Sequence, residues 1–411
     1  MEASEHTLQN EAATQSFSQR LLHASYHKAA EFKRHVPSTE LIQLLDKATA
    51  MLKQEPTLLE LTMEADCRVL MVGDTHGQLH DVVHMMELMG PPSQNQMYIF
   101  NGDFVDRGAW GVELLALLLS LKLEHRARVH LLRGNHEGST CTRFYGFKGE
   151  LDAKYGGPES RAVYAAYKRV FAVLPLAALV HGKTLILHGG LFRYVAPPEP
   201  KEQQQGRGKA GSKAKRRRVA AADPLAPLLI GNLSVLRGAS KGGVDPDGRG
   251  SSAVAADVLW SDPVMDLGLR ENELRGVGLT FGPDITQAFL EANDLRLILR
   301  SHEGPDARDR REDLPQVLQG YALDHDTPAG RLMTVFSAPD YPQFMSSHET
   351  RYNNKGAVAV LSGPTWHEPH MVSFEAARPR PEATAFYEYE TYPDTDDELM
   401  AEELGAASSQ G

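Results

Sequence analysis

Residues 69–83 read VLMVGDTHGQLHDVV, and this stretch holds three structural signals in succession. Val69–Val72 is a short run of aliphatic residues, which predicts a buried strand. The run ends at the turn GDTHG, residues 73–77, which carries an aspartate and a histidine. Beyond it, Leu79–Met89 has the length and apolar spacing of a helix. A strand, a polar turn and a helix in this order favour an α/β fold, in which ligands gather beyond the carboxyl ends of the strands.

The same pattern recurs along the chain. Five further apolar runs end at turns rich in Gly, Asp, Asn or His: Met97–Phe100 before NGDFVDRG (101–108), Val129–Leu132 before RGNHE (133–137), Thr184–Leu187 before HGG (188–190), Leu295–Leu299 before RSHE (300–303) and Met333–Phe336 before SAPDY (337–341). Gly111–Lys122 has the length and apolar spacing of another helix. Strands that deliver polar residues to one edge predict a single functional site at that edge.

The residues in these turns indicate a metal centre. Oxygen and nitrogen ligands without a thiolate suit Mn²⁺, Zn²⁺ or iron. The candidate ligands are Asp74, His76, Asp103, Asn135, His188 and His302. One ion rarely takes so many protein ligands and still leaves room for a substrate, so we expect two ions that share a carboxylate. Two metals about 3.5–4 Å apart can hold a hydroxide nucleophile and bind the oxygens of a transferring phosphoryl group.

Arginines near these turns suit a phosphate substrate, because the planar guanidinium matches phosphate oxygens. Arg107 and Arg133 flank two of the turns, and Arg275 lies in a glycine-rich stretch. The leaving alkoxide also needs a proton, and a histidine held by a carboxylate is the usual donor. His136 with Asp106 fits that role.

Read together, GDTHGQ, NGDFVDRG, RGNHE, LHGG, RSHE and SAPDY resemble, in this order, the signature blocks of the phosphoprotein phosphatase family of serine/threonine phosphatases. LWSDP (259–263) and FGPD (281–284) also match that family. The resemblance covers roughly residues 65–375, less a basic insert. Within the family, GPDAR, SAPDYPQF and RYNNKGA are most similar to the protein phosphatase 7 branch known from plants.

The resemblance implies a calcineurin-like metallophosphoesterase fold, a sandwich of two mixed β-sheets flanked by helices, with a dinuclear metal centre of Mn²⁺ or iron and zinc at the strand ends. It places Asp74, His76 and Asp103 on the first ion, and Asp103, Asn135, His188 and His302 on the second. A hydroxide that bridges the ions would attack the phosphorus. His136 would be the general acid, oriented by Asp106. Arg107, Arg275 and Tyr341 would bind the phosphoryl group, with Asn135 assisting.

Two positions depart from the family pattern. Thr75 stands where the first block usually has Ile, so it is expected to loosen the first metal site slightly. Pro342 stands where several relatives have Cys, which puts sensitivity to Cys-directed toxins in doubt. Neither residue is a predicted ligand.

Charge is distributed unevenly over the 411 residues, whose formal net charge is −11. Residues 201–250 hold eleven Lys and Arg against four Asp and Glu, whereas residues 381–411 hold nine acids and no Lys or Arg. We therefore predict a catalytic domain over 61–380 with a disordered basic insert at about 196–256, and an acidic disordered tail over 381–411. Residues 1–60 form a helical extension, with an amphipathic helix after Pro37 and about 15 disordered residues at its start.

The basic insert suggests partners. Lys213–Arg218 reads KAKRRR, which is typical of a nuclear import signal, so we expect a nuclear location, with the cytoplasm as the alternative. A solvated loop without function is the simpler interpretation. The adjacent leucines resemble a calmodulin target, although prolines interrupt them. The acidic total argues against a dedicated nucleic-acid binder. The longest apolar run, Val170–Val180, is far shorter than the roughly 20 residues that span a bilayer.

Phosphoproteins are therefore the expected substrates, and two other hypotheses stay open at this point. A phosphate-recognising scaffold that has lost catalysis would normally lack a ligand or the acid, and none is missing here. A hydrolase of nucleotides or phosphodiesters would keep the metals, but the blocks around Arg275 and Tyr341 argue against it.

Overall fold

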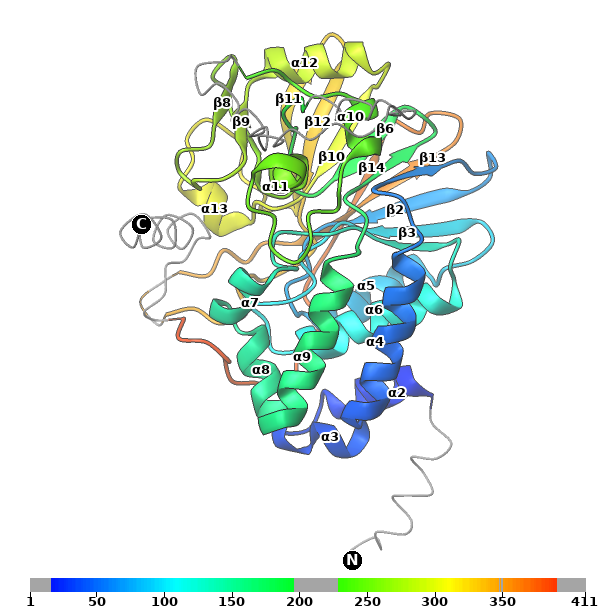
Figure 1. Ribbon diagram of the computed structural model, residues 1–411, viewed down its shortest axis with the longest axis vertical. Coiled ribbons are helices and arrows are strands. Elements are labelled where there is room, and N and C mark those ends of the chain that lie inside the picture. The colour runs from blue at the N-terminus through cyan, green and yellow to red at the C-terminus, as the bar shows by residue number, and fades with distance from the viewer. Residues whose placement is uncertain (1–15, 196–227, 347, 349, 390–411) are drawn as a thin grey trace, which may run out of the picture.

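The computed structural model describes residues 16–195, 228–346, 348 and 350–389. Two β-sheets pack face to face, and helices cover the outer face of each (Figure 1). The helices of the N-terminal half lie against one sheet, and α11 (Ala253–Trp260) and α12 (Pro283–Ala292) pack against the other.

Both large sheets are mixed. The five-stranded sheet has the order β14-β13-β2-β3-β4, and the six-stranded sheet has the order β1-β5-β6-β10-β12-β11. The strands of the first are β2 (Arg68–Val72), β3 (Gln96–Phe100), β4 (Val129–Leu131), β13 (Gly356–Ser362) and β14 (His370–Phe374). Those of the second are β1 (Leu58–Leu61), β5 (Ala177–Val180), β6 (Thr184–Leu187), β10 (Leu297–Arg300), β11 (Tyr321–Thr327) and β12 (Gly330–Val335).

Strand alternation explains the layers, because successive side chains point to opposite faces of a sheet. Val69 and Met71 of β2 lie in the core between the two sheets, whereas Leu70 and Val72 lie in the core beneath the helices. Strand β2 is thus buried on both faces, which explains why it reads as a continuous apolar run.

The remaining elements are mostly helical. They are α2 (Phe17–Ala24), η1 (Ala29–Glu31), α3 (Phe32–His35), α4 (Ser38–Leu52), α5 (Leu79–Met89), α6 (Gly111–Glu124), α7 (Ser139–Phe144), α8 (Phe147–Lys154), α9 (Gly157–Phe171), α10 (Leu233–Gly238), η2 (Gly250–Ser252) and α13 (Pro305–Asp309). A small third sheet joins β7 (Asp262–Pro263), β9 (Leu279–Phe281) and β8 (Leu269–Glu271).

The predicted fold is confirmed: two mixed sheets form a sandwich flanked by helices. All six predicted strands are present, and α5 has the predicted bounds. The predicted helix after Pro37 is α4, which shares its core with α6 and α9. The sequence did not reveal α2, α3 or the small third sheet.

The predicted boundaries of the basic insert need a correction. Residues 196–227, which include Lys213–Arg218, lie outside the described residues. Residues 228–256, however, are ordered and contain α10, η2 and the start of α11. Leu233 and Leu236 of α10 are buried in the same core as α11 and α12. The expected disorder of this second half was wrong because its few apolar residues are anchored by contacts with distant parts of the chain.

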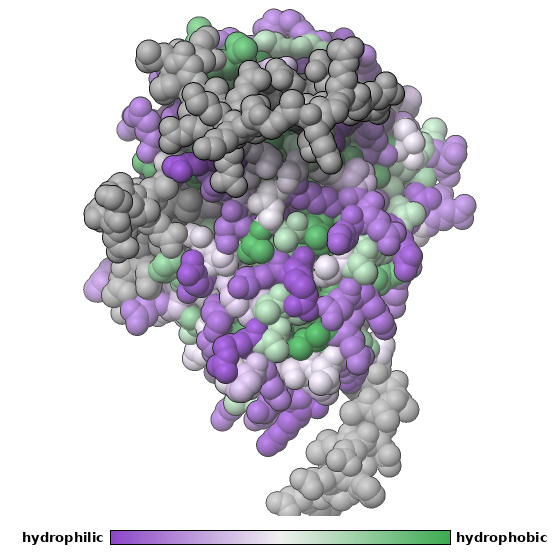
Figure 2. Space-filling model, viewed as in Figure 1, coloured by the Kyte–Doolittle hydropathy of each residue, from purple (hydrophilic) through white to green (hydrophobic). Residues whose placement is uncertain are grey.

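The start of the predicted acidic tail also differs from expectation. Residues 381–389 are described, and the backbone of Phe386 approaches α8 so closely that a Cβ on Gly149 would lie 2.3 Å from its carbonyl oxygen. Residues 390–411 and 1–15 lie outside the described residues. Hydrophilic residues predominate over the helical half of the face in Figure 2, with small separate hydrophobic areas between them. Among the described helices, none has the length and apolar character needed to cross a membrane.

Candidate active site

The two sheets meet at the edge where the polar turns begin. A parallel bridge joins Asp74, just after β2, to Phe336, just after β12. The backbone approach is so close that a Cβ on Gly73 would lie 2.1 Å from the carbonyl oxygen of Val335. Since β2 belongs to one sheet and β12 to the other, this contact brings the strand ends of both sheets to one place.

Asp103, after β3, lies at the centre of the site. Its Oδ2 atom is 3.8 Å from Nε2 of His76 and 3.4 Å from Nε2 of His188. Its Oδ1 atom accepts the backbone N–H of His136 at 2.9 Å. One buried carboxylate oxygen therefore faces histidines that come from different sheets.

The other predicted ligands close the same site. Oδ1 of Asn135 lies 2.8 Å from Nε2 of His188 and 3.0 Å from Nδ1 of His302. Both carboxylate oxygens of Asp74 accept the backbone N–H of His302, at 3.2 and 3.0 Å. The structure thus brings all six predicted ligands together, and each is buried.

The histidines are oriented as metal ligands require. Nδ1 of His76 lies 3.2 Å from the carbonyl oxygen of Val105, and Nδ1 of His188 lies 2.8 Å from that of Asn101. In each histidine Nδ1 faces a backbone carbonyl and Nε2 faces Asp103, which is the arrangement common among metal-binding histidines. Potential ligand atoms of Asp103, His188 and His302 lie within 4.8 Å of one another, as do those of His76, Asp103 and His136. Asp103 belongs to both groups, and the paired Nδ1 of His136 leaves its ring for the acid role described below, so the remaining residues fit cations on either side of Asp103.

Electrostatics point to the same conclusion. Burial, together with the nearby carboxylate of Asp103, raises the pKa of Asp74 to about 8. Burial also lowers the pKa of His76 to about 3, helped by His136. For Asp103, burial opposes ionisation, but His188 and His136 hold the pKa of its carboxyl below the usual range. Crowded buried carboxylates beside a neutral imidazole suit positive ions, which would relieve the repulsion between the two acids.

His136 and Asp106 form the predicted pair. Nδ1 of His136 lies 2.7 Å from Oδ2 of Asp106, and both side chains are buried. The other carboxylate oxygen of Asp106 accepts the backbone N–H of Phe147 at 3.0 Å. Both carboxylate oxygens of Asp106 are therefore engaged in hydrogen bonds. Because Nδ1 of His136 faces this carboxylate, Nε2 on the opposite side of the ring points away from it.

The cleft above these groups is lined by Arg107, Arg275 and Tyr341, together with His76, His136 and His302. The guanidinium of Arg107 lies 4.0 Å from the ring centroid of Tyr145. Nε of Arg275 donates to Asp262 at 2.5 Å. The Tyr341 ring stacks on His76 at a centroid distance of 5.2 Å. The structure brings all three to the same cleft as the predicted acid.

Arg133 does not reach the cleft, contrary to its place among the phosphate-binding candidates. Its buried guanidinium donates to the backbone carbonyls of Glu137, Lys241, Gly243 and Val244. Arg133 therefore ties the strand end after β4 to residues 241–244, and it is a structural residue.

Sequence reasoning assigned no role to Glu137 within RGNHE. Its buried carboxylate accepts the backbone N–H groups of Asp103 and Phe104 at 2.8 Å and of Gly134 at 2.9 Å. The motif contained this residue, but nothing in its spacing showed that it holds the loop of Asp103 in place.

Asp262 is a second residue without an assigned role. It accepts hydrogen bonds from Nη2 of Arg300 at 2.9 Å and from Nε of Arg275, so it positions Arg275 in the cleft.

Thr75 is fully buried, and its backbone N–H donates to the carbonyl of Asp103 at 3.0 Å.

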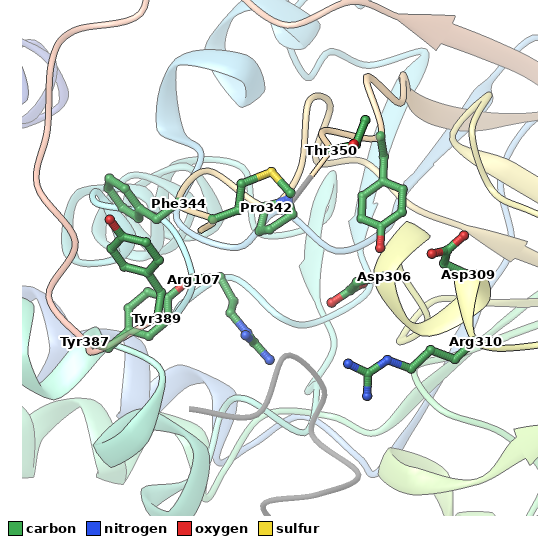
Figure 3. Close-up of a pocket in the computed structure, with 11 residues that line it drawn as sticks. Arg107, Asp306, Asp309, Arg310, Pro342, Phe344, Thr350, Tyr387 and Tyr389 are labelled. Carbon is green, nitrogen blue, oxygen red and sulfur yellow. The ribbon is translucent and has the colours of Figure 1, made fainter. Parts of the chain in front are cut away.

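A wider cleft of about 320 Å³ opens beside the catalytic one and shares Arg107 with it. Figure 3 shows Arg107 and Arg310 extending toward each other across this cleft, with Phe344, Tyr387 and Tyr389 on one side. The hydroxyl of Tyr387 accepts a hydrogen bond from Arg107. The described start of the tail thus forms part of the wall next to the catalytic centre.

Comparisons with known proteins identify the family. Residues 67–306 match the family described as calcineurin-like phosphoesterase. The sequence is 46% identical to serine/threonine-protein phosphatase 7 of Arabidopsis thaliana, over 82% of this chain and 79% of that protein. It is 36% identical to serine/threonine-protein phosphatase 5 of Homo sapiens, over 82% of this chain but only 55% of that protein.

One solved structure is similar throughout the fold. A protein serine/threonine phosphatase from Saccharomyces cerevisiae, described as similar to human phosphatase PP5, superposes with a TM-score of 0.63 at 29% identity. The match covers 85% of this chain and 93% of that one.

Proposed function

The chain belongs to the calcineurin-like phosphoesterase family and is a metal-dependent protein serine/threonine phosphatase. We propose that it hydrolyses phosphoserine and phosphothreonine with the residues of the candidate active site. The observation that carries the proposal is the position of Oδ2 of Asp103, which faces Nε2 of His76 on one side and Nε2 of His188 on the other. A carboxylate in that position suits the bridge between two ions.

The ligands would divide between two ions. Asp74, His76 and Asp103 would hold the first, and Asp103 with Asn135, His188 and His302 would hold the second. Mn²⁺ or an iron–zinc pair suits these oxygen and nitrogen donors. When bound, two such ions supply an activated water and neutralise phosphoryl charge.

The chain's own residues supply the rest of the chemistry. Arg107 and Arg275 bind the phosphoryl oxygens, and Tyr341 closes the cleft over His76. Nε2 of His136 gives a proton to the leaving oxygen of serine or threonine, while Asp106 holds the imidazole in place through Nδ1. Proton donation matters here because an alkoxide is a poor leaving group.

Leaving-group dependence tests the role of His136. His136→Gln is expected to lower kcat for a phosphoserine peptide by about 10²–10⁴-fold, the usual contribution of a general acid. The loss should be much smaller for an aryl phosphate, whose phenolate leaves without a proton. Bound metal, measured by elemental analysis, should stay at the wild-type level, and His370→Gln on exposed β14 serves as the control.

Asp103→Asn completes this test, because it is expected to lose both bound metal and turnover. Wild-type rates for His136→Gln on the phosphopeptide would overturn the assigned acid. A wild-type protein that binds metal without turning over either substrate would instead favour the scaffold hypothesis, and faster turnover of a phosphodiester would favour a different substrate class.

Location and further partners are separate proposals that derive from the sequence. Lys213–Arg218 has the composition that import receptors bind, which supports a nuclear location. Calmodulin binding beside it is the less favoured proposal, because α10 places Leu233 and Leu236 of the leucine stripe in the core.

A further inference from the structure

Three histidines gather at the N-terminal end of the fold, apart from the catalytic centre. His23 lies in the last turn of α2, His27 follows in the connecting turn, and His35 is the last residue of α3. Figure 1 shows α2 and α3 at the end of the molecule farthest from α12. None of these residues belongs to the catalytic blocks.

The three rings lie close together, with those of His27 and His35 stacked. Centroid separations are 4.6 Å between His23 and His27, 5.0 Å between His23 and His35 and 5.0 Å between His27 and His35. One ring nitrogen of each lies within 4.8 Å of the others. Nε2 of His23 and Nε2 of His27 are only 3.1 Å apart. With Zn–N bonds of about 2.0–2.1 Å, two nitrogens of a tetrahedral site lie roughly 3.4 Å apart, which is close to the separation of this pair.

The backbone that carries the cluster is anchored on both sides. Leu21 and Ala24 of α2, together with Phe32 and Val36 around α3, are buried in the main helical core. Arg20 ties the two helices together, since its Nη1 atom donates to the carbonyl oxygen of His35 at 3.0 Å and to Glu40 at 2.9 Å. The histidines therefore extend from fixed positions, which lowers the entropy lost when a ligand binds.

The surroundings favour a cation at the exposed face of the cluster. His23 lies in the last turn of α2, at the negative end of the helix dipole. Nδ1 of His27 faces Oε2 of Glu31 at 3.8 Å, so a carboxylate stands behind the ring whose Nε2 faces His23. Metal-bound histidines commonly have such an acidic partner.

The protonation state also suits a metal. Burial lowers the pKa of His35, and the neighbouring His23 and His27 lower it further, while Glu31 opposes them and Arg34 assists. Only a neutral imidazole can bind a metal ion. The lowered pKa of His35, caused first by burial, favours its neutral form.

We propose that His23, His27 and His35 form a second metal site, separate from the catalytic pair, that takes a divalent transition-metal ion of the zinc class. Three imidazole nitrogens with an open fourth position are an established zinc environment. Imidazole ligands select zinc, copper or nickel rather than Mn²⁺ or Mg²⁺, so the site differs in preference from an oxygen-rich centre. A bound ion would connect α2 to α3.

Zinc stoichiometry tests the proposal in the full chain. Wild type, His27→Gln and the distant surface control His370→Gln are equilibrated with buffered Zn²⁺, and zinc per chain is measured by elemental analysis. The catalytic ligands are the same in all three proteins, so their contribution cancels in the comparison. His27→Gln is expected to hold one zinc fewer than wild type and the control. Equal zinc in all three proteins would overturn the proposal.

Amide hydrogen exchange supplies an independent readout. Zn²⁺ should slow exchange over residues 24–36 in wild type but not in His23→Ala or His27→Gln, because the ion closes the turn between the helices. His23 and His27 are exposed, so these variants should keep the Mn²⁺-supported phosphatase rate, which serves as the check of folding. Equal protection in wild type and variants would contradict a bound ion at this cluster.

Discussion

Five residues of the candidate active site have positive φ angles although none is glycine: His76 (39°), Asp103 (50°), Asp106 (70°), Arg107 (65°) and His302 (76°). Such conformations cost on the order of 1–3 kcal/mol each and persist where the surroundings enforce them. The surroundings here are backbone hydrogen bonds, such as those from Asp103 and Phe104 to the carboxylate of Glu137. These side chains could be predicted as site residues because they follow strands. Their left-handed backbone could not, because nothing in the identity of a non-glycine residue indicates a positive φ angle.

Gly134→Ala tests how tightly the loop of Asp103 is held. A Cβ at position 134 would lie 2.2 Å from Oδ1 of Asp103 and 2.3 Å from its backbone nitrogen, so the carboxylate must move. A displacement of about 1 Å in a catalytic group can cost about 10²-fold in rate. We therefore expect kcat to fall by about 10²-fold and metal binding to weaken.

Gly238→Ala is the matched control for this substitution. A Cβ at position 238 would meet nothing within 4 Å, so activity and metal content should not change. Wild-type kcat in Gly134→Ala would show that the loop around Asp103 adapts, contrary to the tight packing described above.

The helices that follow the catalytic loops depend on a buried ionic cluster. Glu150 of α8 accepts the backbone N–H groups of Gly111 and Val112 at 3.1 and 2.9 Å, and so caps the start of α6 directly after NGDFVDRG. Nζ of Lys154 contacts Glu150 at 2.5 Å and also Glu113. Burial raises the pKa of Glu150 to about 8, while Lys154 opposes this shift. The apolar periodicity that predicted α6 did not reveal that its first turn is held by an acid from another helix.

Lys154→Met should destabilise the fold by about 3–5 kcal/mol, because it removes the cation from two buried carboxylates. Without Lys154 the pKa of Glu150 rises further. Both proteins keep Glu150 protonated in the folded state below about pH 8, so the deficit should grow as the pH rises above the wild-type pKa of about 8, where Glu150 ionises in the wild type but not in the variant. Urea unfolding at several pH values measures this change.

Lys148→Met is the control for that series, since Lys148 pairs with the half-exposed Asp152 one turn away on the same helix. An exposed pair is worth less than about 1 kcal/mol. If Lys154→Met and Lys148→Met unfolded at the same urea concentration at pH 8, the buried cluster would contribute no more to the free energy of unfolding than the exposed pair.

The sandwich could be predicted because its strands are continuous apolar runs that end in recognisable turns. The ordered structure of residues 238–250 could not be predicted in the same way. Their sequence, GASKGGVDPDGRG, has almost no apolar side chains and reads as a loop. Its order comes from distant partners. Arg133 binds the carbonyls of residues 241, 243 and 244, and Nζ of Lys241 donates to the carbonyls of Leu52 and Val173 at 2.9 and 2.6 Å. Local composition cannot show such contacts between chain segments far apart in sequence.

Two deletions distinguish the parts of the basic insert. The described residues on either side of 196–227 lie together, because the N–H of Tyr194 donates to the carbonyl of Leu229 at 2.6 Å and Arg193 bridges to Ile230. A short Gly-Ser linker in place of residues 199–226 therefore closes the chain without moving either end. We expect this variant to keep the wild-type Tm and kcat on a phosphopeptide.

Deleting residues 199–250 should have a different result, because it removes α10 and the carbonyls that bind Arg133. Arg133 is 1% exposed, so its charge would remain buried with three of its acceptor groups gone. Breaking the partners of a buried charge costs about 3–5 kcal/mol, a large share of the 5–15 kcal/mol that stabilises a typical protein. Tm should fall, and activity should fall with it, because Arg133 leads directly into Gly134 and Asn135 of the catalytic centre. Equal Tm values for the two deletions would mean that residues 228–250 contribute nothing to the fold, whereas unequal values place the boundary between insert and catalytic domain near residue 228.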